Sequence, residues 1–217
     1  MRYFLEISYN GSTFHGWQIQ PNAITVQETI ENALGNLLKE EIKIVGAGRT
    51  DTGVHAKHMC AHFDYKNKFD LDDLKNNLNS FLNQEICIKD LYKVKDDAHA
   101  RFSAISREYE YYISLKKDVF SYETSYFIQQ DLNINKMKQA ISIIKEYEDF
   151  EAFSKSNTDV KTFLCNIMTF SLTVPTIALT IFLKNLFALI LNISKLLSSV
   201  NEKLIILHRN VFTSVFD

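Results

Sequence analysis

The glycine-rich segment at residues 46–56 combines the side chains and the spacing that are most suggestive of chemistry. It reads Gly-Ala-Gly-Arg-Thr-Asp-Thr-Gly-Val-His-Ala and sets the carboxylate of Asp51 two residues after the guanidinium of Arg49. Glycines permit positive φ and the close approach of a ligand. A carboxylate beside a guanidinium stays ionised and can act as a nucleophile or a base. Spacing alone leaves two interpretations open: a catalytic Asp51 oriented by Arg49, or an Arg–Asp pair that holds a tight turn.

Two common glycine motifs do not fit this segment. A dinucleotide fingerprint needs a third glycine at the position that Asp51 occupies, and a phosphate loop needs Gly-Lys-Ser/Thr where the sequence has Gly53-Val54-His55. The residues therefore exclude both of these nucleotide-binding interpretations.

Secondary-structure signals predict the helices and strands that position the loop. Apolar spacing predicts helices over 26–40, 71–82 and 134–144, the first two capped by Thr25 and Asp70. Strands are expected over 3–9, 42–47, 59–65, 86–94, 108–115 and 162–168, with a turn at 149–153. The fold class that follows is α+β, a largely antiparallel sheet with helices packed on one face. The strand over 42–47 would hold Asp51 at a rigid edge.

Composition narrows the class of protein. With 46% hydrophobic and 23% charged residues, only two prolines and six glycines, the chain is globular, not collagen-like or Pro-rich. A net charge of −2 predicts no global basic field, although a folded enzyme can carry a local basic groove. Three cysteines without a CxxC motif favour a reduced, cytoplasmic protein. The alternating start lacks the apolar core of a secretory signal.

Several ordered motifs together resemble the tRNA pseudouridine synthase A family. The loop at 48–56 carries the closest resemblance. Other matching segments are Tyr9-Asn10-Gly11, Gly16-Trp17-Gln18, Val26-Gln27-Glu28, residues 97–104, Arg107-Glu108-Tyr109 and Phe150-Glu151-Ala152-Phe153. The resemblance covers about 168 of the 217 residues.

This resemblance implies an isomerase that converts uridine to pseudouridine at positions 38–40 of the tRNA anticodon arm. It implies no metal or organic cofactor, no membrane, and a homodimer with the RNA across both subunits. The fold would have two pseudo-repeated halves, of which the second is expected here to be incomplete. Asp51 would be the catalytic aspartate, Tyr109 would stack in the uridine pocket, and Arg49 would orient Asp51 and fill the space of the extruded nucleotide.

The reaction breaks the C1′–N1 bond, turns the uracil and rejoins it through C5. A carboxylate could attack C1′ or remove a ribose proton, and the sequence does not separate these routes. His55, Arg101 and Arg107 are further candidate substrate contacts. Lys57, Arg101 and Arg107 suit phosphates, with ordinary solvated charge as the alternative.

Other conspicuous residues favour plainer interpretations. His55, His58, Cys60 and His62 suggest zinc, but four ligands are not expected to converge from a strand whose residues alternate between two faces. Core packing is favoured over RNA stacking for Trp17. Alternation puts Tyr109 and Tyr111 on one strand face, Tyr111 beneath the pocket, and Tyr112 on the other face, in the core.

The sequence changes character near Thr169, which suggests residues 1–105 and 106–168 as two halves and 169–217 as a divergent apolar tail. The tail holds six of the fifty charged residues and lacks the arginine and glycines that the family pattern calls for. Three hypotheses remain open: a frame shift, a divergent strand and helix, or a membrane span over 170–193 interrupted by Lys184 and Asn185. The alternative function is an impaired family remnant that at most binds RNA.

Overall fold

The computed structural model of the chain describes residues 1–153, 162–173, 177–184 and 206–211. Their contacts define two compact units. The first comprises residues 1–105 and 207–211, and the second comprises the described residues from 106 to 184 together with Ile206. Each unit is described separately below.

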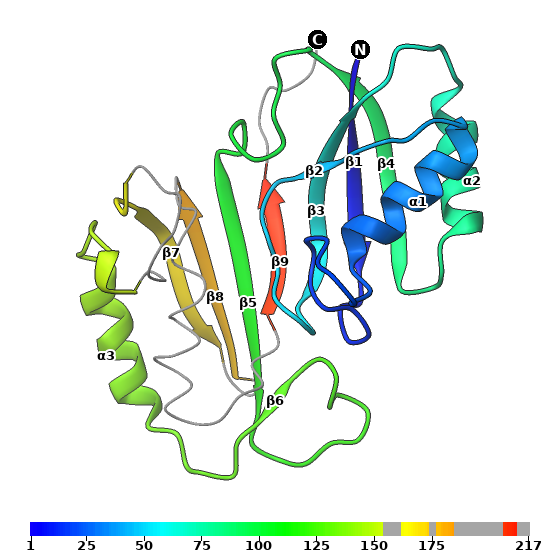
Figure 1. Cartoon of the computed structure of the whole chain (residues 1–217). Helices are drawn as coiled ribbons and strands as arrows, with labels where there is room; N and C mark the ends of the chain where they lie inside the picture. The colour runs from blue at the N-terminus through cyan, green and yellow to red at the C-terminus, as the bar shows by residue number, and fades with distance from the viewer. Residues whose placement is uncertain (154–161, 174–176, 185–205, 212–217) are drawn as a thin grey trace. The chain divides into compact units, whose positions relative to one another are not determined.

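The first unit is a sheet with two helices on one face (Figure 1). Strand β1 lies between β4 and β3 and is antiparallel to both, β2 pairs antiparallel with β3, and β9 pairs parallel with β3. The elements are β1 (Arg2–Tyr9), α1 (Val26–Leu38), β2 (Val45–Gly46), β3 (His55–Asp64), α2 (Leu71–Phe81), β4 (Ile86–Val94) and β9 (Ile206–Val211).

Both helices of this unit begin where the sequence predicts. The Thr25 hydroxyl accepts a hydrogen bond from the Glu28 N–H at 3.4 Å, and the Asp70 carboxylate accepts one from the Asp73 N–H at 2.9 Å. Each cap satisfies an N–H that the first helical turn leaves without a partner. Helix α1 ends at Leu38, because Lys39 adopts a left-handed φ of 59°.

The core of the first unit lies on both sides of β1. Phe4, Leu5 and Ile7 are fully buried, so neighbouring residues of this strand point into apolar surroundings on opposite faces. Burial of each such side chain contributes about 1.5–3 kcal/mol. The helical stripe of α1 is buried as predicted, with Ile30 and Leu34 at 0% exposure.

The expected strand over 42–47 is wrong in extent, since only Val45–Gly46 forms β2. Ile42 and Ile44 are buried, as their apolar character indicates. However, the Ile44 N–H donates to the Glu31 carboxylate of α1 at 3.0 Å. A side chain from the helix thus takes the place of a strand partner.

The second unit is a smaller antiparallel sheet with strand order β5-β8-β7. Short β6 pairs parallel with β5, and α3 packs against β7. The elements are β5 (Ser106–Ser114), β6 (Tyr126–Phe127), α3 (Ile134–Ile144), a 3-10 turn (Glu151–Phe153), β7 (Asn166–Thr173) and β8 (Ile177–Lys184). The α+β class with a largely antiparallel sheet is therefore confirmed.

Strand structure crosses the sequence boundary at Thr169. β7 begins four residues later than expected and continues to Thr173, and β8 pairs with both β7 and β5. Among the described residues, no helix is long and apolar enough to cross a membrane. Within the apolar stretch 170–193, residues 185–193 lie outside the described part of the chain.

A bidentate ion pair joins the first residue of β1, Arg2, to the last residue of β3, Asp64. The Arg2 guanidinium donates to both Asp64 oxygens, at 2.9 and 2.7 Å, and to the Ala98 carbonyl at 2.9 Å. Its hydrogen bond to Asp64 holds the pKa of that carboxyl below its usual value. Because the Asp64 side chain is 60% exposed, solvent weakens the pair.

We expect Asp64→Asn to lower the free energy of unfolding by about 0.5–1 kcal/mol at pH 7. A carboxyl with a depressed folded-state pKa contributes stability above its unfolded pKa of about 3.9, and that contribution is lost as the pH falls through the folded pKa. The gap between wild type and variant should therefore close in acid. Urea unfolding at a series of pH values checks this, and a gap that persists unchanged in acid would contradict it.

Candidate active site

The loop that carries Asp51 connects two strands of the first unit. β2 leads into it and β3 leads out, and the Ala47 N–H donates to the Cys60 carbonyl at 2.8 Å. The Val54 N–H donates to the Asp51 carbonyl at 3.2 Å and closes a four-residue turn. Gly53, the third residue of this turn, has a φ of +78°, a conformation that favours glycine. Asp51 thus occupies the first corner of a tight turn on a strand-anchored loop.

A second segment, residues 9–17, holds this loop from the other side. The Tyr9 and Thr50 hydroxyls hydrogen-bond at 2.8 Å. The Trp17 N–H donates to the Thr50 carbonyl at 3.1 Å, and the Gly53 N–H donates to the Phe14 carbonyl at 3.2 Å. Bonds on both sides of Asp51 therefore fix the loop backbone.

Two glycines of the second segment leave no room for a side chain. A Cβ on Gly16 would lie 2.2 Å from the Thr50 carbonyl oxygen, and one on Gly11 would lie 2.1 Å from that of Val54. Gly16 also has a φ of +85°. The two backbones can approach this closely only because both residues lack a Cβ.

Trp17 is a core residue, as predicted. Its ring is 3% exposed, lies 6.2 Å from that of Tyr9, and packs so closely on Gly46 that a Cβ there would come within 2.5 Å of it. The indole therefore packs against the last residue of β2, where the loop begins.

Asp51 and Arg49 are both exposed to solvent. Among the ion pairs of the described residues, none joins these two side chains. The pairing expected from the sequence is therefore not present in this structure. Backbone contacts made by Thr50, Gly53 and Val54 position Asp51 instead.

His55 lies inside the protein. It is 5% exposed, and its Nδ1 accepts a hydrogen bond from the Gly11 N–H at 3.3 Å. The imidazole thus joins the loop that carries Asp51 to the second segment. The sequence predicted His55 as a substrate contact, and that role stays a prediction. The hydrogen bond between Gly11 and His55 joins two segments that are distant in the sequence, so residue spacing does not reveal it.

Arg101 follows β4 in a turn at the end of the first unit. Its guanidinium carbon lies 5.7 Å from the centroid of the Phe102 ring, which is 69% exposed. The Arg101 N–H donates to His99 Nδ1 at 3.1 Å. The residue is half-buried, and a role in phosphate binding remains a prediction.

In the second unit, Tyr109 and Arg107 are buried on β5, each 3% exposed. Tyr111 shares their face and is 1% exposed, as alternation predicts. Burial raises the pKa of both tyrosines. The expectation of a core Tyr112 is wrong: that residue is half-buried, because its face of β5 is the more open one, and its hydroxyl donates to Glu110 at 3.1 Å.

The four suggested zinc ligands do not form one cluster among the described residues. His55 bonds to Gly11, and His62 Nδ1 accepts from the Ala100 N–H at 3.2 Å. Burial lowers the pKa of His62 to about 4. His58 and Cys60, however, lie on the same strand face, because they are two residues apart. They meet Glu6, which spacing along the sequence could not associate with them.

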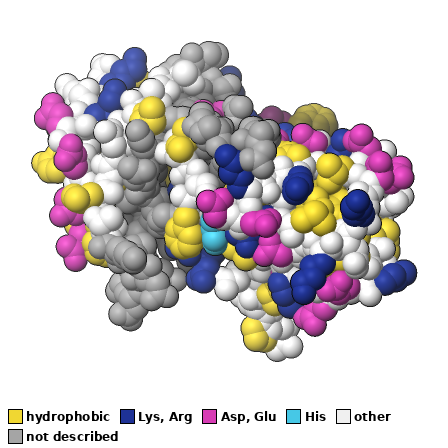
Figure 2. Space-filling model, turned by 90° about the horizontal axis from the view of Figure 1, so that it is seen from above, with side chains coloured by type: hydrophobic (Ala, Val, Ile, Leu, Met, Phe, Trp, Pro, Cys, Tyr) yellow, Lys and Arg dark blue, Asp and Glu magenta, His cyan; other side chains and the backbone are white. Residues whose placement is uncertain are grey.

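Charges of both signs lie on the described part of one face of the molecule. On the described part of the face in Figure 2, Lys and Arg side chains are interspersed with Asp and Glu. This pattern agrees with the net charge of −2. Binding of RNA would therefore depend on local basic groups rather than on a uniform field.

The Tyr9–Thr50 bond gives a direct test of loop support. Burial raises the pKa of the Tyr9 hydroxyl, which therefore stays protonated. We expect Tyr9→Phe to lower the free energy of unfolding by about 0.5–1.5 kcal/mol, since Thr50 loses its partner. The control is Tyr3→Phe, which loses only a weak 3.7 Å contact to the Met1 sulfur. Equal urea midpoints for the two variants would contradict this role.

Comparison with known proteins places the chain in a class. Residues 7–103, which contain the loop and its supporting segment, match the family described as tRNA pseudouridine synthase. Pseudouridine synthases are isomerases that modify RNA. The chain is 46% identical over 168 residues to tRNA pseudouridine synthase A of Bacteroides fragilis, covering 77% of this chain and 67% of the relative. It is 48% identical over 167 residues to that of Parabacteroides distasonis, covering 76% and 66%.

The chain belongs to the tRNA pseudouridine synthase A family, as the resemblance of its motifs predicted. It spans about two thirds of the length of the curated relatives it matches.

Proposed function

We propose that this chain converts uridine to pseudouridine at positions 38–40 of the tRNA anticodon arm, with Asp51 as the catalytic residue. The observation that carries this proposal is the placement of Asp51. Its carboxylate is exposed, while its backbone is held by a turn, by β2 and β3, and by residues 9–17. An accessible group on a rigid support is what attack on an extruded nucleotide requires.

The substrate base must leave the helical stack before Asp51 can reach it, at a cost of about a few kcal/mol. The carboxylate then attacks C1′ or removes a ribose proton, and in either route the C1′–N1 bond breaks. The freed uracil turns and C5 bonds to C1′. In the first route this breaks the bond between C1′ and the Asp51 oxygen, and in the second Asp51 returns the proton to the ribose. The hydrogen on C5 leaves as a proton and N1 takes one up, so the Asp51 carboxylate is regenerated. Confinement of the uracil prevents its loss during this rotation.

The remaining site residues have supporting roles in the proposal. Tyr109 forms an aromatic wall for the uracil, since stacking is worth about 1–3 kcal/mol per base. Arg49 fills the space that the extruded nucleotide leaves, and the half-buried Arg101 contacts RNA phosphates. Arg107 shares the buried face of β5 with Tyr109 and contacts the substrate from there. His55 acts through its bond to Gly11 and positions the loop.

The assembly that we propose is a cytoplasmic homodimer that holds one tRNA across both subunits and uses no cofactor. Each subunit would contain two related halves, with the boundary near residue 105.

An impaired family member that only binds RNA is the alternative function. The observation that favours it is the extent of the match, which leaves about a quarter of this chain and a third of the relative uncovered. A frame shift near residue 169 would account for that difference, and sequencing of the gene across that codon tests it.

Mapping of the product tests the proposal against this alternative. The full chain is incubated with an anticodon-arm RNA that carries uridine at positions 38, 39 and 40, and pseudouridine is located by chemical labelling and primer extension. The control RNA has cytidine at these three positions. We expect product at one or more of the three positions in the first RNA. RNA binding by folded protein without product would support the impaired family member.

A further inference from the structure

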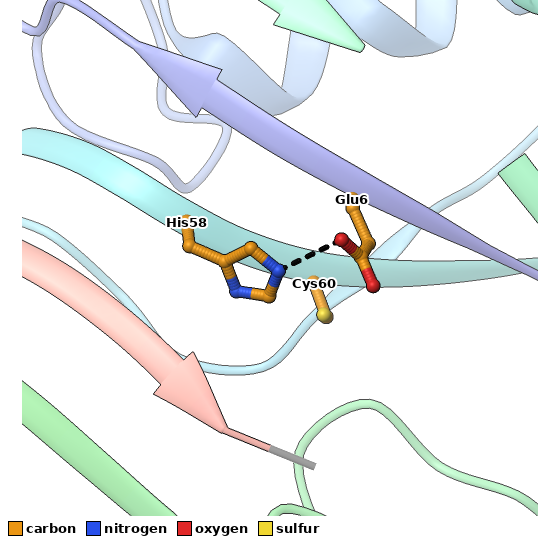
Figure 3. Close-up of side chains that lie close together, drawn as sticks. All are labelled: Glu6, His58 and Cys60. Atoms are coloured by element: carbon orange, nitrogen blue, oxygen red, sulfur yellow. Dashed lines mark hydrogen bonds and ion pairs between the residues drawn. The ribbon is translucent and has the colours of Figure 1, made fainter. Parts of the chain in front are cut away.

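Glu6, His58 and Cys60 form a cluster on the strands of the first unit, apart from the turn that carries Asp51. Glu6 of β1 is the direct cross-strand partner of Cys60 on β3, and His58 precedes Cys60 by two residues. All three side chains therefore project from the same face of the sheet. Figure 3 shows them directed toward one another. We propose that this cluster is a binding site for a divalent metal ion, with Zn²⁺ as the ion that fits it best.

The distances suit a small ion. The three potential ligand atoms lie within 4.8 Å of one another, and the Glu6 Oε2 to His58 Nε2 distance is 2.9 Å. Zinc binds nitrogen and oxygen at about 2.0–2.2 Å and sulfur at about 2.3 Å, so the ligand atoms of a tetrahedral site are about 3.3–3.8 Å apart. Binding requires side-chain rotations that bring the three atoms to these separations, with the ion in place of the proton shared by Glu6 and His58.

The donor set selects the class of metal. A thiolate and an imidazole favour zinc and related transition metals, whereas magnesium and calcium prefer sites made of oxygen ligands. Burial raises the pKa of the Cys60 thiol, which is a neutral group when no metal is bound. On binding, the S–H bond breaks, sulfur keeps the electron pair for the metal, and the proton passes to solvent.

The surroundings hold the cluster in place. The Tyr92 hydroxyl of β4 donates to the second Glu6 oxygen at 3.1 Å, an outer contact of the kind that orients metal-binding carboxylates. His58 Nδ1 is buried and has no hydrogen-bond partner within the described part of the chain. The two nitrogens of an imidazole point in different directions, so Nε2, which faces Glu6, is the ligand atom, and Nδ1 is left for an outer partner such as water.

An ion has a route to the cluster. The Glu6 and His58 side chains are 27% and 20% exposed, whereas Cys60 is fully buried. Entry is therefore from the Glu6–His58 side, where water can supply the fourth ligand. Three protein ligands with one open position is a common arrangement for zinc.

Metal titration of the full chain tests the site. After treatment with a chelator, the protein is titrated with Co²⁺ and then with Zn²⁺. We expect one equivalent of Co²⁺ to produce a thiolate-to-metal charge-transfer band, which Zn²⁺ then abolishes. Cys60→Ser should remove the band. His58→Gln and Glu6→Gln should each weaken binding more than about tenfold, because even the loss of an outer partner costs about 10–100-fold.

The control variant is Cys87→Ser, which removes an exposed cysteine of β4 and should leave the band unchanged. Circular dichroism checks that each variant is folded. If Cys60→Ser does not fold, the test rests on Glu6→Gln and His58→Gln, whose side chains are partly exposed. Unchanged metal binding by both of these folded variants would then overturn the proposal. Absence of the band in folded wild type would overturn the proposal. So would a band that survives Cys60→Ser or disappears with Cys87→Ser. The spectrum does not depend on RNA modification, so the two proposals can fail independently.

Discussion

Replacement of Asp51 with alanine is expected to abolish pseudouridine formation, with a fall in rate of at least about a thousandfold. The reaction in either proposed route depends on this carboxylate, and no neighbouring acid in the turn can replace it. Its side chain is exposed and accepts no hydrogen bond within the described residues, so the substitution should change the free energy of unfolding by less than about 0.5 kcal/mol. Rate measurements combined with urea unfolding separate catalysis from stability.

The matched control for this prediction is Asp131→Ala. Asp131 is also exposed, and it lies before α3 of the second unit, outside the proposed catalytic machinery. We expect this variant to keep the wild-type rate. Equal rates for the Asp51 and Asp131 variants would contradict the assignment of Asp51.

Replacement of Gly16 with alanine should have the second-largest effect, although the residue has no side chain to lose. The added Cβ would lie 2.2 Å from the Thr50 carbonyl oxygen and 3.1 Å from the Asp51 carbonyl carbon. Both neighbours are backbone atoms, so the loop itself must move. Displacement of a catalytic group by about 1 Å can lower a rate about a hundredfold. We expect a loss of that size, together with destabilisation.

The Gly53→Ala variant distinguishes steric crowding by an added Cβ from the strain of a left-handed backbone. Gly53 also has a positive φ, +78° against +85° for Gly16, but a Cβ on Gly53 would meet nothing within 4 Å. Its cost should be limited to left-handed strain of about 1–2 kcal/mol. Parallel rate and thermal-unfolding measurements compare the two. If the two variants lower the reaction rate and the melting temperature equally, close packing of Gly16 against the loop does not position Asp51.

Local signals predicted much of the fold and the location of the site. The caps at Thr25 and Asp70 mark helix starts because a short polar side chain satisfies the first N–H groups. β4 matches the expected Ile86–Val94, although its alternation of buried and exposed residues is interrupted after Ile88, where the register of its pairing with β1 shifts. The loop around Asp51 was found because a glycine cluster around charged residues is uncommon in packed strands or helices.

Features that depend on contacts distant in sequence were missed. The Glu31–Ile44 bond shortened an expected strand, and no sequence pattern shows that a helix carboxylate will reach that N–H. Glu6 joins Cys60 only through the register of β1 against β3. Arg49 and Asp51 are close in sequence but form no ion pair in the described structure, and the turn is held through backbone hydrogen bonds.

Release of tritium from [5-³H]uridine reports catalysis by Asp51, because formation of the C5–C1′ bond expels the hydrogen on C5. The substrate is an anticodon-arm RNA labelled at positions 38–40, and wild type and Asp51→Ala are measured side by side at equal concentrations of folded protein. We expect release to water by the wild-type chain and none above background by the variant. Equal release by both proteins, or none by folded wild type, would contradict it.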